Sequence, residues 1–384
     1  MPSRPEASRV LRRLLVWAFL VRVAVGVFVA GLNLDDLFAP DHRTYHYFAD
    51  WLARYWAGDT LAYPWKLLDK GPKAYYYIVA AVYYALGSAE FLPKALNVAL
   101  GTMSVALCFE IALGLDAGER AALRAARFTA YFPSLVLWST LNIRDSWVVF
   151  LILLICRETI GLLEGVRLWP LVRLIASILL VSQFRDYILL PVTVPAALCF
   201  LVRGRAHLGR NLAVGFLVAA AVIYTDRAFG SARLRSVDLE TFQEIRRGTA
   251  EGASQFDPNA DISTPTKALV FLPKGLAYFL LAPFPWQLAG LRQALTLPEM
   301  LFLYSLVPSI VRGIIRLARD HGPPALLVLL VSAGLTMGYA LGQANTGTAY
   351  RHRAQVLPFF LIYAAVGATR QGLGPRLVRD GAVG

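Results

Sequence analysis

Residues 14–32 read LLVWAFLVRVAVGVFVAGL, a nearly continuous apolar run. About 20 such residues in helical form cross the hydrocarbon core of a bilayer, so the run predicts a transmembrane helix. No convincing small-residue cleavage site follows it, which favours a retained helix over a cleaved signal peptide. Basic residues precede the run and place its start in the cytoplasm by the positive-inside rule: Arg4, Arg9, Arg12 and Arg13.

The composition of the whole chain agrees with this first run. Of 384 residues, 57% are hydrophobic and 16% are charged, against about 25% charged in a typical soluble domain. Mean hydropathy is +0.53. The net charge of +13 lies mostly in short loops between apolar runs, which indicates membrane topology and not nucleic-acid binding. The three cysteines are far apart and show no disulfide or zinc spacing.

Working outward from residues 14–32, hydropathy and the positions of Arg and Lys predict about ten transmembrane helices with both termini cytoplasmic. We therefore expect an all-α polytopic membrane protein, a single transmembrane domain over residues 1–384. The expected spans are residues 14–32, 91–115, 128–141, 146–163, 169–184, 187–202, 212–224, 300–317, 324–341 and 355–368.

Two long external loops are expected. The first covers residues 33–90 and contains a Tyr-rich segment, 74–87, which reaches only about 21 Å as a helix and is therefore predicted to lie at the interface. The second covers residues 225–297. Its apolar segment 268–286 is broken by three prolines and is predicted to be re-entrant or interfacial, because the next span ends in arginines that belong inside.

Polar residues gather on the predicted external side. They are Asp35, Asp36, Asp41, His42, His46, Asp50, Asp69, Lys70 and Lys73 in the first loop, Arg144–Asp145 and Arg185–Asp186 in short turns, and Arg351, His352 and Arg353 in the last loop. Carboxylates and arginines that face one cavity suit a reaction of an anionic lipid headgroup, since the arginine fork binds phosphate oxygens in pairs and a carboxylate acts as a general base.

Simpler explanations exist for each element. An Arg–Asp pair at a helix end is often a local ion pair and cap. Arg351 and Arg353 suit interfacial anchors equally well. His42 and His46 are spaced for a metal on one helix face, although a solvated polar face is commoner, so a divalent metal stays open and no cofactor is certain.

The order of these features resembles the GT-C superfamily of polyprenyl-phosphate-sugar-dependent glycosyltransferases. It is most similar to the bacterial lipid A aminoarabinose transferases and the protein O-mannosyltransferase-like group. The motifs that carry the resemblance are Asp41-His42-Arg43-Thr44-Tyr45, Asp69-Lys70-Gly71-Pro72-Lys73 before the Tyr-rich segment, Phe132-Pro133-Ser134 through Arg144-Asp145, and Tyr350-Arg351-His352-Arg353 through Leu357-Pro358. His42 stands where the family has Glu.

This resemblance implies a GT-C-like fold and an inverting transferase at the outer face of a bacterial inner membrane. A sugar would pass from a polyprenyl-phosphate donor to a lipid or glycan acceptor. Asp41 would be the general base, with Asp35 and Asp36 as its competitors. Tyr45 belongs to the same motif. Lys70, Arg351 and Arg353 would hold the donor phosphate, and Lys73 and Arg144 are further candidates for this role. Arg185, in an external turn, is also expected to bind substrate.

Two other functions stay open. A polymerase or ligase of lipid-linked glycans uses the same donors and external arginines. A transporter or flippase of a lipid-linked anionic glycan would bind without chemistry, and it predicts ionisable residues at mid-membrane depth.

Overall fold

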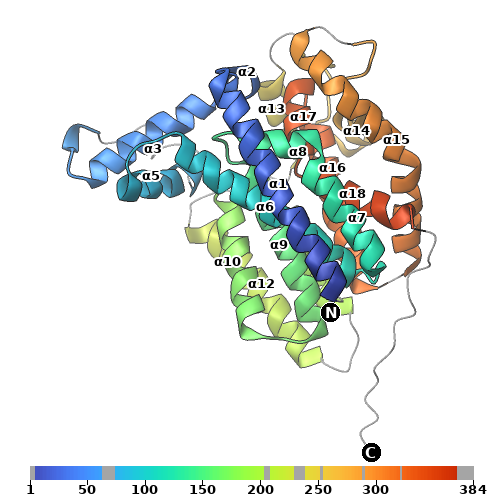
Figure 1. Cartoon of the computed structure of the whole chain (residues 1–384). Coiled ribbons are helices and arrows are strands. Elements are labelled where there is room, and N and C mark those ends of the chain that lie inside the picture. The colour runs from blue at the N-terminus through green and yellow to red at the C-terminus, as the bar shows by residue number, and fades with distance from the viewer. Residues whose placement is uncertain are drawn as a thin grey trace, which may run out of the picture.

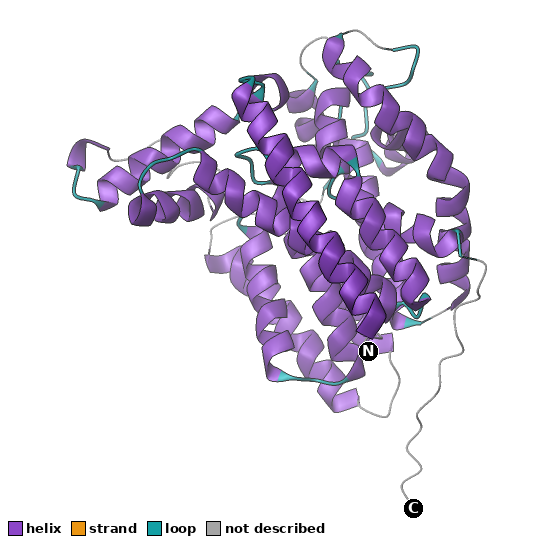
Figure 2. Cartoon of the chain, viewed as in Figure 1, coloured by secondary structure: helices purple, strands orange, loops and turns teal. Residues whose placement is uncertain are grey.

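The computed structural model describes residues 5–62, 74–202, 208–228, 238–250, 254–287, 290–320 and 322–369. Within these ranges the secondary structure consists of 17 α-helices and two short 3₁₀ helices, without a strand. Figure 2 shows the same make-up of helices and loops. The prediction of an all-α protein is confirmed. Lys70 and Lys73 lie outside the described residues.

Five helices are long and apolar enough to cross a membrane. They are α1 (Pro5–Gly31), α6 (Phe91–Gly114), α9 (Asp145–Glu164), α15 (Leu291–Asp320) and α16 (Pro323–Gly342). Five shorter apolar helices accompany them: α5 (Ala74–Leu86), α10 (Leu168–Ser182), α11 (Leu189–Val202), α12 (Leu208–Ala228) and α18 (Leu357–Gly367). These helices indicate a membrane-embedded protein, and the expected number of ten spans stays a prediction.

The outer face of α1 supports this conclusion. Trp17, Val27 and Phe28 are each about 60% exposed or more, and a soluble protein rarely exposes so many large apolar side chains together. α1 packs on α6 and α7 (Gly118–Tyr131), and the helices form one bundle with α2 (Asp35–Phe38) and α17 (Thr346–Arg353) at the end opposite the N-terminus (Figure 1).

The buried centre of the bundle is made by α18, which packs against α15 and α7. Two glycines allow the close approach of α15 and α18. A Cβ at Gly313 would collide with the backbone of Tyr363, and a Cβ at Gly367 would collide with the backbone of Ser309. Small residues at such contacts are typical of helix packing in membranes.

The expected span 128–141 and the loop before it differ from the structure. α7 already begins at Gly118, so Arg120, Arg124 and Arg127 lie in a helix and not in a loop, and a second helix, α8 (Pro133–Trp138), follows it. The alanine-rich sequence of α7 has high helix propensity despite its charges. Pro133 then ends α7, because proline lacks the N–H that an unbroken helix needs.

Three more differences concern helix limits. α15 begins at Leu291 and therefore includes residues expected in the second external loop. The apolar segment expected to be re-entrant or interfacial is largely one helix, α14 (Pro265–Leu281), and α13 (Leu239–Thr249) precedes it. Its place in the membrane stays a prediction. The expected loop 343–353 contains α17, which begins where the Asn345 side chain accepts hydrogen bonds from the backbone N–H groups of Gly347 and Thr348.

The first loop forms an arm. α3 (His42–Trp56) packs along α5, and the two project from the side of the bundle (Figure 1). Tyr45 and Tyr75 make an edge-to-face contact at the base of this arm, with ring centroids 5.0 Å apart. The 13 residues of α5 span only about 20 Å as a helix. The arm connects the end of α1 to the bundle and positions the residues at the start of α3.

Candidate active site

Four segments that lie far apart in the sequence meet at the end of the bundle marked by α2 and α17 (Figure 1). Asp41 directly precedes α3, Asp145 begins α9, Arg185 follows α10, and Arg351 and His352 belong to α17. Each of the five residues lies at or near a helix end. Their side chains form one continuous polar network.

Arg351 is the centre of this network. Its Nη1 donates to both carboxylate oxygens of Asp41, at 3.0 and 2.9 Å. Its Nε and Nη2 lie 2.8 and 2.6 Å from Oδ2 of Asp145. Burial lowers the pKa of the Arg351 guanidinium, but the charges of Asp145 and Asp41 outweigh burial and raise it above the ordinary value. Arg351 is therefore a permanent cation between two carboxylates.

The two carboxylates differ in access. The Asp41 side chain is 39% exposed, whereas that of Asp145 is 1% exposed. Asp145 also accepts from Nη2 of Arg185, at 3.0 Å, and from Nε2 of Gln355, at 3.3 Å. Asp145 therefore orients Arg351 from the protein interior, while Asp41 is available to a ligand.

Asp145 was not among the predicted site residues. The sequence placed it beside Arg144 in a turn, where a local ion pair was the simpler expectation, and its cationic partners are Arg185 and Arg351 instead. A carboxylate that starts a long apolar helix is a usable signal, because desolvated Asp is rare without a paired cation.

His352 also belongs to the network, because it contacts Arg185. Its Nε2 lies 2.7 Å from Nη1 of Arg185, which is always a donor, so Nε2 must be the acceptor. Burial lowers the pKa of this imidazole well below its usual value, and the positive charge of Arg185 lowers it further. His352 is therefore a neutral hydrogen-bond acceptor at neutral pH. Arg185 also donates to the hydroxyl of Tyr187.

Arg144 lies beside the network. Its Nη1 donates to the backbone carbonyl of Phe184 at 3.1 Å, and its Nε is buried with no hydrogen-bond partner among the described residues. Tyr45 is buried against Tyr75 and Tyr76 in the arm, and burial raises the pKa of its hydroxyl. Tyr45 thus packs the base of the arm, close to the cations of the site.

The three acids that follow α1 have three different environments. Asp35 pairs with Lys94 at 2.7 Å. Asp36 pairs with His42 at 3.0 Å and with Arg43. Desolvation raises the pKa of the Asp36 carboxyl, but these hydrogen bonds outweigh it and leave the pKa lowered.

Asp41, by contrast, joins the network of Arg351. Asp41 and Asp36 were both candidates for the catalytic base, and the contacts favour Asp41.

Arg353 lies outside the network of Arg351 and contacts other groups. It is buried, and it donates to the backbone carbonyls of Phe279, at 2.8 Å, and of Ala282. Its Nη1 contacts the sulfur of Met300 at 2.9 Å. Burial lowers the pKa of Arg353 to about 10. These contacts tie α17 to α14 and α15, so we assign Arg353 a structural role and not a part in phosphate binding.

A cavity of about 730 Å³ adjoins the network. Pro40, next to Asp41, and Arg351 both line it. Most of its wall is apolar and comes from α1, α8 and the start of α15, including Val25, Phe28 and Leu137. Glu299 and Tyr350 add polar groups. The cavity thus joins a charged edge to an apolar interior between two helices, α1 and α15, whose outer faces are themselves apolar.

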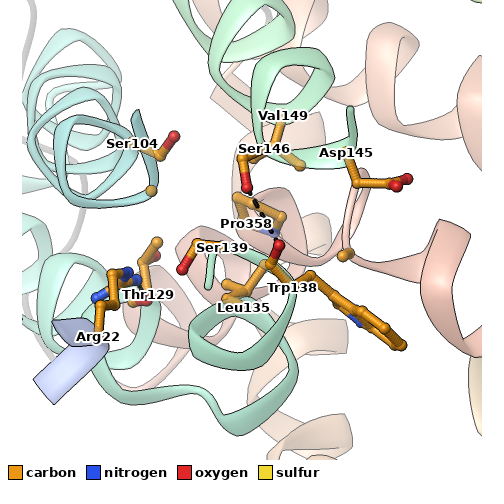
Figure 3. A pocket seen from close by; sticks show the side chains of 12 residues that line it. Arg22, Ser104, Thr129, Leu135, Trp138, Ser139, Asp145, Ser146, Val149 and Pro358 are labelled. Atoms are coloured by element: carbon orange, nitrogen blue, oxygen red, sulfur yellow. Dashed lines mark hydrogen bonds between the residues drawn. The ribbon is translucent and has the colours of Figure 1, made fainter. Parts of the chain in front are cut away.

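A second, small cavity lies deeper (Figure 3). Its volume of about 20 Å³ has room for a single water. Arg22, Ser139, Ser146 and Asp145 are among the residues around it, and the Ser146 hydroxyl donates to the Trp138 carbonyl at 3.4 Å. It lies beside Asp145, its open wall is mostly apolar, and it is too small for a substrate.

The two histidines of the arm, His42 and His46, contact different side chains. His42 contacts Asp36, and Nδ1 of His46 lies 2.8 Å from the Tyr83 hydroxyl. Across the part of the chain that the structure describes, no group of three or more His, Cys, Asp or Glu residues is placed to hold a metal ion. We therefore assign no residue to a metal.

Comparison of the sequence with models of known protein families and with curated protein sequences found no match.

Proposed function

We propose that this protein is a membrane glycosyltransferase of the GT-C type, which transfers a sugar from a polyprenyl-phosphate donor to an acceptor hydroxyl at the external face of a bacterial inner membrane. The observation that supports it most is the pair of Asp41 and Arg351 at the edge of the large apolar cavity. One carboxylate and one buried guanidinium are the groups that a single inverting displacement requires. The apolar wall suits the polyprenyl chain.

The reaction assigns each group a role. The Asp41 carboxylate accepts the proton of the acceptor hydroxyl as the hydroxyl oxygen attacks the anomeric carbon. The bond from that carbon to the phosphate oxygen breaks, and the leaving polyprenyl phosphate keeps the electron pair. Arg351 stabilises the negative charge on the phosphate, helped by Arg144. Asp145 is a positioning residue that holds Arg351, and Arg185 in turn holds Asp145.

The contacts of Arg351 suggest how donor binding prepares the base. Nη1 of Arg351 holds both oxygens of Asp41, whereas Nε and Nη2 are held by the buried Asp145. A donor phosphate competes for Nη1, because the other nitrogens are already fixed. Asp41 is then released towards the acceptor hydroxyl.

The test is a donor assay with the purified full-length protein. The protein is incubated with polyprenyl phosphate carrying a radiolabelled sugar and with extracted envelope lipids and glycans as acceptors. Release of polyprenyl phosphate and equal transfer of label to an acceptor support the proposal. Transfer of an oligosaccharide only from a polyprenyl diphosphate donor would identify a polymerase or ligase instead.

Binding without release of lipid phosphate would identify a transporter, the third candidate. A transporter predicts ionisable groups at mid-membrane depth, and Arg22 lies within α1. Its guanidinium, however, donates to the backbone carbonyls of Ala18 and Ala130 at 3.0 and 2.9 Å. Arg22 thus joins α1 to α7, a structural role that favours the enzyme.

A further inference from the structure

A second buried carboxylate, Glu299, lies on the wall of the large cavity. It belongs to α15, it follows Pro298, and it is only 4% exposed. Its Oε2 accepts hydrogen bonds from the backbone N–H of Ser134, at 2.7 Å, and from the Tyr350 hydroxyl, at 2.9 Å. These two donors, from α8 and α17, fix the orientation of the carboxyl group.

The other carboxylate oxygen of Glu299, Oε1, differs from Oε2 in its hydrogen bonding. Oε1 is buried and has no hydrogen-bond partner among the described residues. A buried polar atom without a partner is costly, and most such atoms in native proteins have one. Arg353, whose charge acts on Glu299, does not supply the partner, because its nitrogens contact the carbonyls of Phe279 and Ala282 and the sulfur of Met300.

The position of Glu299 relates it to the candidate active site. Glu299, Tyr350 and Arg351 line the same 730 Å³ cavity, and Tyr350 is the neighbour of Arg351 in α17. A ligand whose phosphate reaches Arg351 therefore occupies the space that Glu299 borders. The group that would satisfy Oε1 is a hydrogen-bond donor, and a sugar next to the phosphate offers several hydroxyl donors.

From this arrangement, and resting on the proposed function, we propose that Glu299 accepts a hydrogen bond from a hydroxyl of the transferred sugar and so sets the specificity for the donor sugar. Tyr350 positions Glu299, and Arg351 holds the adjoining phosphate. The site recognises a neutral hydroxylated sugar on a polyprenyl phosphate. The Glu299 carboxylate contacts the sugar, and the Arg351 guanidinium contacts the phosphate of the same ligand.

The proposal is tested by binding of two probes to the full-length protein in lipid nanodiscs. One probe is bare polyprenyl phosphate. The other is the same lipid carrying a neutral hexose or pentose, chosen from a small panel as the tightest binder to the wild type. The wild type is expected to bind the glycosylated lipid more tightly than the bare lipid.

The variant Glu299→Gln keeps the shape of the side chain and an oxygen for the N–H of Ser134. We expect it to weaken binding of the glycosylated probe by about 10-fold or more, because a hydrogen bond to a charged acceptor is lost, and to leave binding of bare polyprenyl phosphate unchanged. Glu110→Gln is the matched control, since Glu110 pairs with Arg157 in another part of the bundle. It should change neither affinity.

Several results would overturn the proposal. Equal loss for both probes in Glu299→Gln would show that the substitution disturbs the cavity and not a sugar contact, and no loss would remove Glu299 from the site. A wild type that binds bare and glycosylated lipid equally would refute the sugar contact while leaving the lipid-phosphate site intact. If the wild type binds neither probe, the proposed function itself fails.

Two further variants keep the test decisive. Glu299 and Pro133 also border another cavity, of about 400 Å³, which Arg127 lines. If Arg127→Gln shows the selective loss, the sugar belongs to that cavity and the assignment is wrong. If Glu299→Gln does not fold, Tyr350→Phe takes its place, because it removes the hydroxyl that orients Glu299. A selective loss of the glycosylated probe is expected there too, and its absence refutes the proposal.

Discussion

The two ends of helix α9 each carry a buried carboxylate between two arginines. Asp145 begins the helix and pairs with Arg185 and Arg351. Glu158 lies near its other end and pairs with Arg157 and Arg173 at 3.0 and 2.8 Å. Both acid side chains are 1% exposed. The two networks therefore look alike in composition and in the burial of the acid.

The two networks differ in how deeply their arginine side chains are buried. Around Glu158, the Arg157 and Arg173 side chains are 30% and 47% exposed, and both oxygens of Glu158 are satisfied. Around Asp145, the Arg185 and Arg351 side chains are only 5% and 16% exposed. Burying a guanidinium costs several kcal/mol of desolvation. A network that buries its cations beside a cavity needs an explanation beyond helix anchoring, and ligand binding supplies one.

The largest effect on turnover that we predict separates Asp41, at the exposed edge of the first network, from Asp36, outside it. Asp41→Asn keeps the shape and removes the charge of the proposed base. Turnover should fall by about 100-fold or more, as is typical when a general base is lost, while donor binding is kept. The measurement is release of lipid phosphate under single-turnover conditions.

Asp36→Asn is the matched control, and it should lose less activity because Asp36 contacts His42 and Arg43 instead of Arg351. If Asp36→Asn abolishes turnover and Asp41→Asn does not, the base belongs to the earlier acid pair and the Asp41 assignment fails.

The second prediction compares the two acids of α9 in stability. Asp145→Asn leaves the buried Arg185 without its carboxylate partner and removes one of the two countercharges of Arg351, so it should lower the free energy of unfolding by about 3–5 kcal/mol. Glu158→Gln should cost only about 1 kcal/mol, because its arginines reach solvent. Denaturant unfolding in detergent measures both. Equal losses would show that cation burial does not distinguish the two networks.

The third prediction compares the arginines. Arg351→Gln removes the proposed phosphate contact and should reduce turnover by roughly 30- to 1000-fold, with weaker donor binding. Arg157→Gln, at the opposite end of α9, should stay within about twofold of the wild type, since a half-exposed ion pair contributes little. Near-normal kinetics in a well-folded Arg351→Gln variant would remove Arg351 from the site.

The smallest expected effect is a pH dependence of stability from His352. Its pKa is lowered in the folded protein, whereas in the unfolded chain it is about 6.5. Below that pH the unfolded state binds a proton that the folded state does not, so stability falls as the pH drops through about 6.5, by at most about 1.4 kcal/mol per pH unit.

His352→Gln keeps an acceptor for Arg185 and has no such proton. Melting temperatures between pH 7.5 and 5 should therefore decline less steeply in this variant than in the wild type. Parallel curves for the two proteins would contradict the assignment of a neutral, buried imidazole.

The sequence predicted the long apolar helices well. α1, α6, α9 and α16 each lie within a few residues of the expected limits, apart from the N-terminal extension of α1, because an apolar run and its flanking polar residues define a span locally. It failed for α7 and α17, where charged residues suggested loops. Hydropathy does not detect such helices, since alanine propensity and an asparagine cap specify them instead.

The sequence by itself determined that helices fill the described bundle and that acids and arginines gather at helix ends. Only the tertiary structure decided which of them meet. Arg351 and Arg353 are equivalent in sequence, but residues two apart on a helix point about 200° away from each other. Arg351 therefore contacts Asp41, 310 residues earlier in the chain, whereas Arg353 contacts the backbone of α14. Local propensity and hydropathy act over a few residues, and only packing of the whole bundle selects partners at such a separation.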